Sequence, residues 1–320
     1  MIVLGVDGGN TKTIALIAGA DGAVLGKGRA GCGDVHGIPG PTAAIDEIEA
    51  AVSAALASAA ICADELAAAV FSLAGADWEE DFDFIRAELH GRLGIDGLLV
   101  VNDAIGLLRC GSATAVGVAV GVGTGAAIAA RNSTGAVFHL GFWPEPMGGD
   151  ALIRGALRAA YRADLGLAPR TALADRLCEL FDAGSVAELR FLLNRRERKN
   201  GVVGRGIPSI VLDEADGGDQ VASELVSELG RSLGQAARIT ADAVDLESSE
   251  PLVLGGGVMS HPSNRLANAI AAAGGFDSIV RSRLHPVLGA VALAFDVVAC
   301  EPPLERLIGG LPDEGYFATA

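Results

Sequence analysis

The stretch that decides the fold is Ile2-Val3-Leu4-Gly5-Val6-Asp7-Gly8-Gly9-Asn10-Thr11-Lys12-Thr13. Its apolar first half predicts a buried strand that ends at a carboxylate, and the chain then turns through two glycines. Glycines let backbone N–H groups converge on phosphate oxygens, and a lone aspartate at a strand end can hold Mg²⁺ through water. An ordinary strand followed by a glycine turn is the alternative. We expect phosphate contacts from Gly8, Gly9, Asn10, Thr11 and Lys12, and a metal contact from Asp7.

Four later segments also place apolar residues next to a glycine or an aspartate. They are Val101–Ala104, Val120–Gly125, Leu252–Val258 and Pro286–Ala290. In this order they resemble the actin-like ATPase and sugar-kinase superfamily, and within it the N-acetylglucosamine kinases and the BadF/BadG/BcrA/BcrD ATPases. The resemblance covers residues 1–297. It implies an α/β fold in which two ribonuclease-H-like domains face a nucleotide cleft.

The resemblance also implies roles for individual residues. Phosphoryl transfer needs a positioned phosphate donor, a metal ion and a base for the acceptor hydroxyl's proton. The base would be Asp103, which follows an apolar strand over residues 97–101; the structural alternative is an N-cap on the helix that begins at Ala104. ATP and Mg²⁺ are the implied cofactors. The further nucleotide contacts that it implies are Gly123, Thr124, Gly125, Gly255, Gly256 and Gly257.

The acceptor region departs from the amino-sugar kinases. They carry Gly-Asp-Glu-Gly-Ser after a Gly-Trp-Gly turn, whereas this chain has Gly148, Gly149 and Asp150 after Trp143. If Trp143 and Gly148 match, Gly149 replaces the aspartate and Asp150 replaces the glutamate. An asparagine expected after the first strands is replaced by Gly33-Asp34-Val35-His36. The candidate acceptor contacts are Asp34, His36, Asp77, Asn102 and Asp150, and a purely structural or solvated role is the alternative for each.

Composition limits the partners. The 320-residue chain has a formal net charge of −16, and nucleic-acid binding depends on clustered Lys and Arg, so nucleic acid is not expected. One basic run, residues 195–199 with Arg205 nearby, is interpreted as a solvated helix end or loop, with a phosphate or partner site as the alternative. No uninterrupted apolar stretch could span a bilayer and no signal peptide precedes Ile2, so a cytoplasmic protein is expected. The five cysteines form no C-x-x-C pair, which argues against disulfides and zinc.

The pattern of strands restarts after residue 111 and echoes the beginning of the chain, as expected of two related halves. We therefore expect an N-terminal domain over residues 1–112, a C-terminal domain over 113–300 and an irregular tail over 301–320. Strands are expected at 2–7, 14–17, 24–25, 68–73, 97–101, 115–122, 126–131, 136–140 and 252–254. Helices are expected at 41–60, 79–93, 147–165, 171–182, 185–193, 219–244, 263–273 and 286–299.

Three functions follow from the resemblance. The first is an ATP-dependent kinase that phosphorylates a hydroxyl of a sugar or amino sugar similar to N-acetylglucosamine or glucosamine. The second is a BadF-type ATPase that acts on a protein partner; the cysteine-bearing segment of its relatives is not evident here. The third is a sugar sensor, for which no DNA-reading domain is visible before Ile2. A homodimer is the expected assembly.

Overall fold

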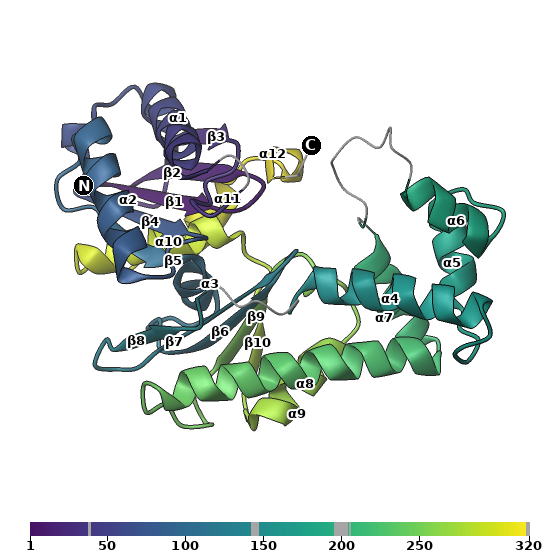
Figure 1. Cartoon of the computed structure of the whole chain (residues 1–320). Helices are drawn as coiled ribbons and strands as arrows, with labels where there is room; N and C mark the ends of the chain where they lie inside the picture. Colours follow the sequence, from purple (N-terminus) through teal and green to yellow (C-terminus); the bar gives the residue numbers. More distant parts are fainter. Residues whose placement is uncertain (38–39, 142–146, 195–203, 205, 318–320) are drawn as a thin grey trace.

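The computed structural model describes residues 1–37, 40–141, 147–194, 204 and 206–317. Two five-stranded mixed sheets with helices packed on them form the molecule (Figure 1). The strand order is β3-β2-β1-β4-β5 in the first sheet and β10-β9-β6-β7-β8 in the second. The fold is therefore α/β with two halves, as the sequence predicts.

The two sheets share one plan. In the first, the antiparallel strands β1 (Ile2–Gly8), β2 (Thr13–Gly19) and β3 (Val24–Ala30) are extended by the parallel strands β4 (Ala68–Leu73) and β5 (Leu99–Asn102). In the second, β6 (Gly117–Val122), β7 (Ala126–Arg131) and β8 (Val137–His139) are extended by β9 (Leu252–Gly255) and β10 (Ile279–Arg281). Counted from β5 and from β10, the two orders correspond strand by strand, which confirms the repeat expected from the sequence.

Helices cover both sheets. The first half contains α1 (Pro41–Ala59), the short 3₁₀ helix Ala63–Glu65, α2 (Glu79–Leu93) and α3 (Asp103–Gly111). The second contains α4 (Gly149–Asp164), α5 (Leu173–Leu180), α6 (Val186–Leu193), α7 (Ile207–Asp216), α8 (Gln220–Asp242) and α9 (Arg265–Gly274). The chain returns to the first sheet with α10 (Pro286–Val297), α11 (Leu304–Gly309) and α12 (Glu314–Phe317), drawn in yellow beside the purple strands in Figure 1. Among the described helices, none has the length and apolar character needed to cross a bilayer.

Strand β1 is buried on both faces, which explains its nearly continuous apolar sequence. Successive side chains point to opposite faces of a strand. Val3 packs in the cluster that contains α10, whereas Leu4 and Val6 pack in the cluster that contains α1 and α2. The carboxylate of Asp7 follows at the end of this strand, so a rigid, buried element positions it.

The helices α3 and α10 lie between the two sheets, α3 against β6, β7 and β9 and α10 against β1 and β4. They cross at two glycines: a Cβ on Gly289 would overlap the carbonyl oxygen of Gly106. Beside this crossing, Arg109 Nε and Nη2 donate to the carboxylate of Asp296 at 2.8 and 3.1 Å. The Arg109 residue is only 5% exposed, whereas the Asp296 side chain is 37% exposed, so the two helices are joined by an ion pair with one buried partner.

The structure also adds elements that the sequence patterns did not predict. Helix α7 and strand β10 were not expected; β10 has only three residues, too few for a periodic signal. The segment after residue 301 was expected to be irregular, and this expectation is corrected by α11 and α12, which bury Leu307 and Phe317. The domain boundary expected at residue 112 stays a prediction. Helix α10 lies after this boundary in the sequence but packs against the first sheet.

We expect Gly289→Ala to destabilise the protein strongly, by about 2 kcal/mol or more, because the added methyl group must push α10 away from α3. The measurement is the free energy of unfolding in urea. Gly91→Ala on α2 is the matched control, since a Cβ there meets nothing within 4 Å; it should stabilise the helix by about 0.5–1 kcal/mol. Equal effects of the two substitutions would show that the crossing does not require glycine.

Candidate active site

A cleft of about 650 Å³ opens between the two sheets, at the carboxyl ends of β1, β4 and β5. Ligands of open α/β sheets bind at such strand ends. The predicted site residues that line it are Asp7, Gly9, Asn10, Thr11, Asp34, His36, Asp77, Asn102, Asp103, Gly123, Thr124, Gly125, Asp150 and Gly256. The cleft therefore collects most of the expected residues from seven separate parts of the chain.

Four predicted nucleotide contacts are absent from the residues that line this cleft. Gly8 and Gly255 are the last residues of β1 and β9, where their backbones pair with neighbouring strands. Gly257 follows the turn at Gly256, and a Cβ added to it would meet no atom within 4 Å. Lys12 is directed elsewhere, as described below. Their proposed roles remain predictions.

The turn between β1 and β2 is held by its own backbone and by the loop before α1. Gly9 N donates to Lys12 O at 2.9 Å, and Gly33 N donates to Gly9 O at 3.0 Å. The Asn10 side chain donates to Asp34 Oδ2 at 3.0 Å. The other oxygen, Oδ1, accepts from the backbone N of His36 at 2.9 Å. Asp34 thus links the glycine turn to the loop that carries His36.

The side chain of Lys12 lies at the C-terminal helix. Its ammonium group donates to the carbonyl oxygen of Phe317. Arg29 donates to the carbonyl of Tyr316 at 2.6 Å, and the ring of Phe317 stacks on His285 with centroids 3.7 Å apart. Phe317 of α12 therefore contacts both Lys12, in the turn between β1 and β2, and His285, which directly precedes the cleft residue Pro286.

The start of α3 distinguishes the two roles considered for Asp103. The N-cap of the helix is Asn102, whose Oδ1 accepts from Ala104 N at 3.1 Å. Its amide nitrogen donates to Asp77 Oδ1 at 3.0 Å and to Ala76 O at 3.2 Å. Asn102 therefore caps the helix and also holds the Asp77 side chain. Asp103 is the first residue of the helix and lines the cleft.

Three carboxyl groups in the cleft, those of Asp7, Asp77 and Asp103, have raised pKa values. Burial, reinforced by the negative charges of Asp7 and Asp77, raises the pKa of Asp103 to about 7. Burial also raises the pKa of Asp7 to about 6, against the opposing effect of the Lys12 charge. The pKa of Asp77 is raised by burial as well, while His36 acts in the opposite direction. Perturbed carboxyl groups in a cleft are typical of functional sites.

On the opposite wall, the Gly123–Gly125 turn is fixed by the start of α4. Gly149 N donates to Gly123 O at 2.8 Å, and Asp150 N donates to Thr124 O at 3.0 Å. Arg154 also lines the cleft and was not predicted. Its position four residues after Asp150 places both on one face of a helix, and this spacing is the signal that could have identified it.

Gly256 makes the close turn after β9. It has a φ of 92°, and a Cβ there would lie 2.6 Å from the carbonyl oxygen of Val122 at the end of β6. Only glycine fits this position without strain. Two glycine-containing turns, one from each neighbouring strand, thus lie side by side at the cleft.

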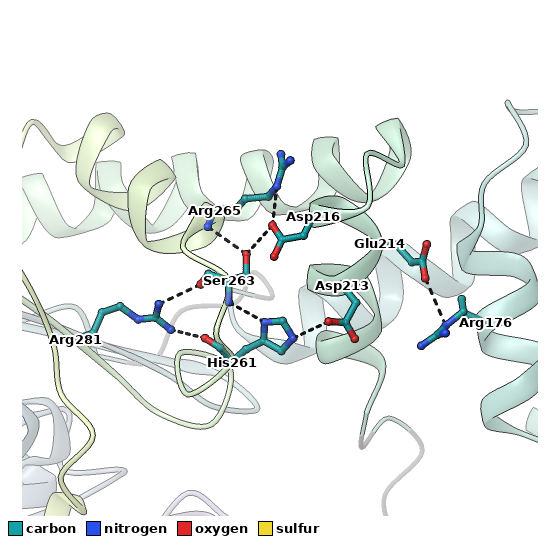
Figure 2. Close-up of polar contacts among 8 residues, drawn as sticks. All are labelled: Arg176, Asp213, Glu214, Asp216, His261, Ser263, Arg265 and Arg281. Carbon is teal, nitrogen blue, oxygen red and sulfur yellow. Dashed lines mark hydrogen bonds and ion pairs between the residues drawn. The ribbon is translucent and has the colours of Figure 1, made fainter.

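The loop that follows Gly256 is immobilised by a polar network (Figure 2). Arg281 on β10 donates to the carbonyl oxygens of His261 and Ser263, the latter at 3.2 Å. The His261 ring contacts Asp213 on α7 at 3.1 Å, and Ser263 Oγ donates to Asp216 on the same helix at 3.0 Å. This network ties the loop, which follows the Gly256 turn, to α7 and β10.

Comparison with known proteins gives the family. The model of the BadF/BadG/BcrA/BcrD ATPase family matches residues 4–294. The chain belongs to this family. No curated protein sequence matches it significantly. The family match spans nearly the whole chain. It includes the glycine turns at Gly9, Gly123–Gly125 and Gly256 and the strand that leads to Asp103, so it covers all the residues that line the cleft.

Solved structures show that the chain has the actin-like two-domain fold. A candidate N-acetylglucosamine kinase from Chromobacterium violaceum has 21% identity and a TM-score of 0.67, over 92% of this chain and 98% of that chain. A ROK family glucokinase from Streptomyces griseus, solved with glucose and AMPPNP, has 19% identity and a TM-score of 0.61, over 92% and 100%. A ROK family transcriptional regulator has 14% identity and a TM-score of 0.59, over 97% and 81%. At these identities the likeness shows the fold alone.

The residues of this BadF/BadG/BcrA/BcrD family member are compatible with a magnesium ion. Among the described residues there is no group of three or more side chains that could form a complete protein cage for a metal. Mg²⁺ does not need one, because it commonly binds through one or two carboxylates together with water and phosphate oxygens. Asp7 lines the cleft beside the glycine turn, and its buried carboxylate would be favoured in the ionised form by a nearby cation.

The raised pKa of Asp103 predicts a specific effect of pH on stability. The unfolded carboxyl group ionises near its ordinary pKa of 3.8 and the folded one near 7, so the free energy of unfolding should fall as pH rises between these values. Asp103→Asn removes this penalty. We expect the variant to be more stable than the wild type at pH 8, by on the order of 2 kcal/mol, with the difference shrinking towards pH 4.

Thermal unfolding of both proteins across this pH range measures the effect. Asp96→Asn makes the same chemical change at an exposed turn and should leave the pH dependence of the wild type in place. If Asp103→Asn showed the same dependence as Asp96→Asn, ionisation of Asp103 would not oppose folding.

Proposed function

We propose that the protein is an ATP-dependent kinase that phosphorylates a hydroxyl of a sugar or amino sugar, similar to glucosamine or N-acetylglucosamine. The observation that carries the proposal is the juxtaposition of Asp103, a carboxyl group with a pKa of about 7, with glycine turns from both sheets in one cleft. Phosphoryl transfer uses a base beside a phosphate-binding backbone, and in this proposal Asp103 and the glycine turns would fill these two roles.

In this proposal, the backbone of Gly9–Thr11 contacts the phosphates from the first sheet, and Gly123–Gly125 approaches them from the second. Asp103 accepts the proton of the acceptor hydroxyl as the hydroxyl oxygen bonds to the γ-phosphorus, and the bond from that phosphorus to the β–γ bridging oxygen breaks, so that ADP leaves. A base whose pKa lies near neutral pH is well matched to this step, which typically contributes 10²–10⁴ in rate. Mg²⁺ bound at Asp7 would offset the charge on the phosphate oxygens.

The acceptor would lie against the first sheet, where Asp34, His36, Asp77 and Asn102 line the cleft, with Asp150 facing them from α4. Carboxylate and amide oxygens accept hydrogen bonds from hydroxyl and ammonium groups, and such groups give a sugar kinase its specificity. A homodimer working in the cytoplasm, where ATP is available, completes the proposal.

A second candidate is an ATPase that couples nucleotide binding to a protein partner. The description of the family as ATPases supports it, and so does the replacement of the aspartate of the amino-sugar kinases by Gly149.

Two segments singled out in the sequence lie outside the described residues. They are the stretch around Trp143, residues 142–146, and the basic run at 195–199 with Arg205.

The two candidates differ in whether ATP turnover needs a sugar. We expect ADP release from Mg²⁺-ATP to rise at least tenfold with one member of a panel of glucosamine, N-acetylglucosamine, N-acetylmannosamine and glucose. Asp103→Asn should lower that turnover by about 10²-fold or more while ATP affinity changes little. Acceptor-independent ADP release at a steady rate would favour the ATPase instead, and retention of most turnover in Asp103→Asn would remove the assigned base.

Gly125→Val should weaken ATP binding by about tenfold or more, because its side chain would occupy the space proposed for phosphate. A Cβ at this position meets no protein atom within 4 Å, so the melting temperature should change little. The measurement is ATP affinity by calorimetry together with thermal unfolding. Gly256→Val is a poorer test because it would also clash with β6. Unchanged ATP affinity in Gly125→Val would place the nucleotide elsewhere.

A further inference from the structure

Asp81, in the first turn of α2, organises the part of the cleft where the acceptor is proposed to bind. Its Oδ2 atom accepts from the backbone N of Asp77 at 3.2 Å and of Trp78 at 2.9 Å. The same oxygen lies 3.1 Å from Nε2 of His36. The Asp81 side chain is only 15% exposed. One carboxylate oxygen therefore fixes both the backbone beside Asp77 and the ring of His36.

The His36 ring is oriented by two groups from the segment that follows β4. Asp81 bonds Nε2, and the indole of Trp78 meets the ring edge to face, with centroids 5.4 Å apart and an interplanar angle of 88°. The backbone N of His36 is held by Asp34 at 2.9 Å. His36 lines the cleft, and its other ring nitrogen, Nδ1, has no hydrogen-bond partner among the described residues.

These contacts define the tautomer of a neutral His36. Oδ2 of Asp81 already accepts two backbone N–H groups, so it acts as an acceptor and Nε2 supplies the hydrogen. In a neutral imidazole the other nitrogen is then an acceptor. Nδ1 thus presents a lone pair and needs a donor, which a hydroxyl group can provide.

We propose that His36 is a specificity-determining residue that accepts a hydrogen bond from a hydroxyl of the acceptor at Nδ1, and that Asp81 is the positioning residue that fixes its tautomer. The proposal rests on the proposed kinase function and defines one contact of its acceptor. A site that hydrogen-bonds a hydroxyl group favours ligands that carry this group over ligands that lack it, and because the His36 side chain is 39% exposed, the hydroxyl competes with water for this contact.

Two substitutions separate a role of Nδ1 from a merely structural role of the bond to Asp81. In asparagine, the side-chain oxygen can take the position of Nδ1, whereas in glutamine the amide nitrogen can take the position of Nε2. His36→Asn therefore keeps an acceptor for the substrate and loses Asp81, while His36→Gln keeps the bond to Asp81 and loses the acceptor. The proposal and the structural alternative predict opposite rankings.

The experiment measures kcat and KM for the sugar that stimulates ADP release most strongly. His36→Gln should raise the acceptor KM by at least tenfold, with kcat and the ATP KM nearly unchanged, and His36→Asn should raise it by less than about threefold. Glu80→Gln, which neutralises an exposed neighbour of Asp81 in the same helical turn, should match the wild type. A larger loss in His36→Asn than in His36→Gln would overturn the proposal.

A second measurement keeps this test separate from the fate of the kinase proposal. The ¹⁵N signals of the His36 imidazole should show the Nε2–H tautomer at alkaline pH, and glucosamine, N-acetylglucosamine or glucose should shift the Nδ1 signal in the presence of a non-hydrolysable ATP analogue. If no sugar stimulates turnover, the kinase proposal fails, while a shifted Nδ1 signal would still support the hydroxyl contact. An Nδ1–H tautomer, or an Nδ1 signal that none of these sugars moves, would overturn the role of His36.

Discussion

The structure depends on the close contact between α3 and α10. One helix packs on the second sheet and the other on the first, and Gly106 and Gly289 bring their backbones together without any intervening side chain. A Cβ on Gly289 would overlap the carbonyl oxygen of Gly106, whereas a Cβ on Gly106 would overlap the hydroxyl of Ser72 on β4. Strand ends from both sheets bound the cleft, and the ion pair between Arg109 and Asp296 joins the same two helices.

The second constraint is electrostatic. The cleft gathers Asp7, Asp77 and Asp103, and burial raises the pKa of each. Such an arrangement opposes folding at neutral pH, since ionised carboxylates are poorly solvated inside a protein. The rest of the fold must compensate for it. Carboxyl groups whose pKa values are shifted by burial are typical of functional sites, and this is where a fold keeps groups that lower its stability.

Much of the fold and of the site could be predicted from the sequence, because both rest on local signals. The strand and glycine turn at Ile2–Thr13 and the Asn102–Asp103 step lie at the cleft as expected. What could not be predicted depends on contacts between distant segments. The engagement of Lys12 by Phe317 joins residues 305 positions apart, and the contact between His36 and Asp81 spans 45. No pattern in the sequence marks either pair, and α12 was missed because a short helix stabilised by packing has no periodic signal of its own.

The position of α10 has a consequence for how the chain is made. The five strands of the first sheet are complete by residue 102, whereas the helix that covers Val3 and closes over Gly5 begins only at Pro286. While the nearly two hundred residues between β5 and Pro286 are being synthesised, α10 is not available to this face, on which α3 can already pack. Pro286 itself lines the cleft, so the set of lining residues is complete only after this late segment has been synthesised.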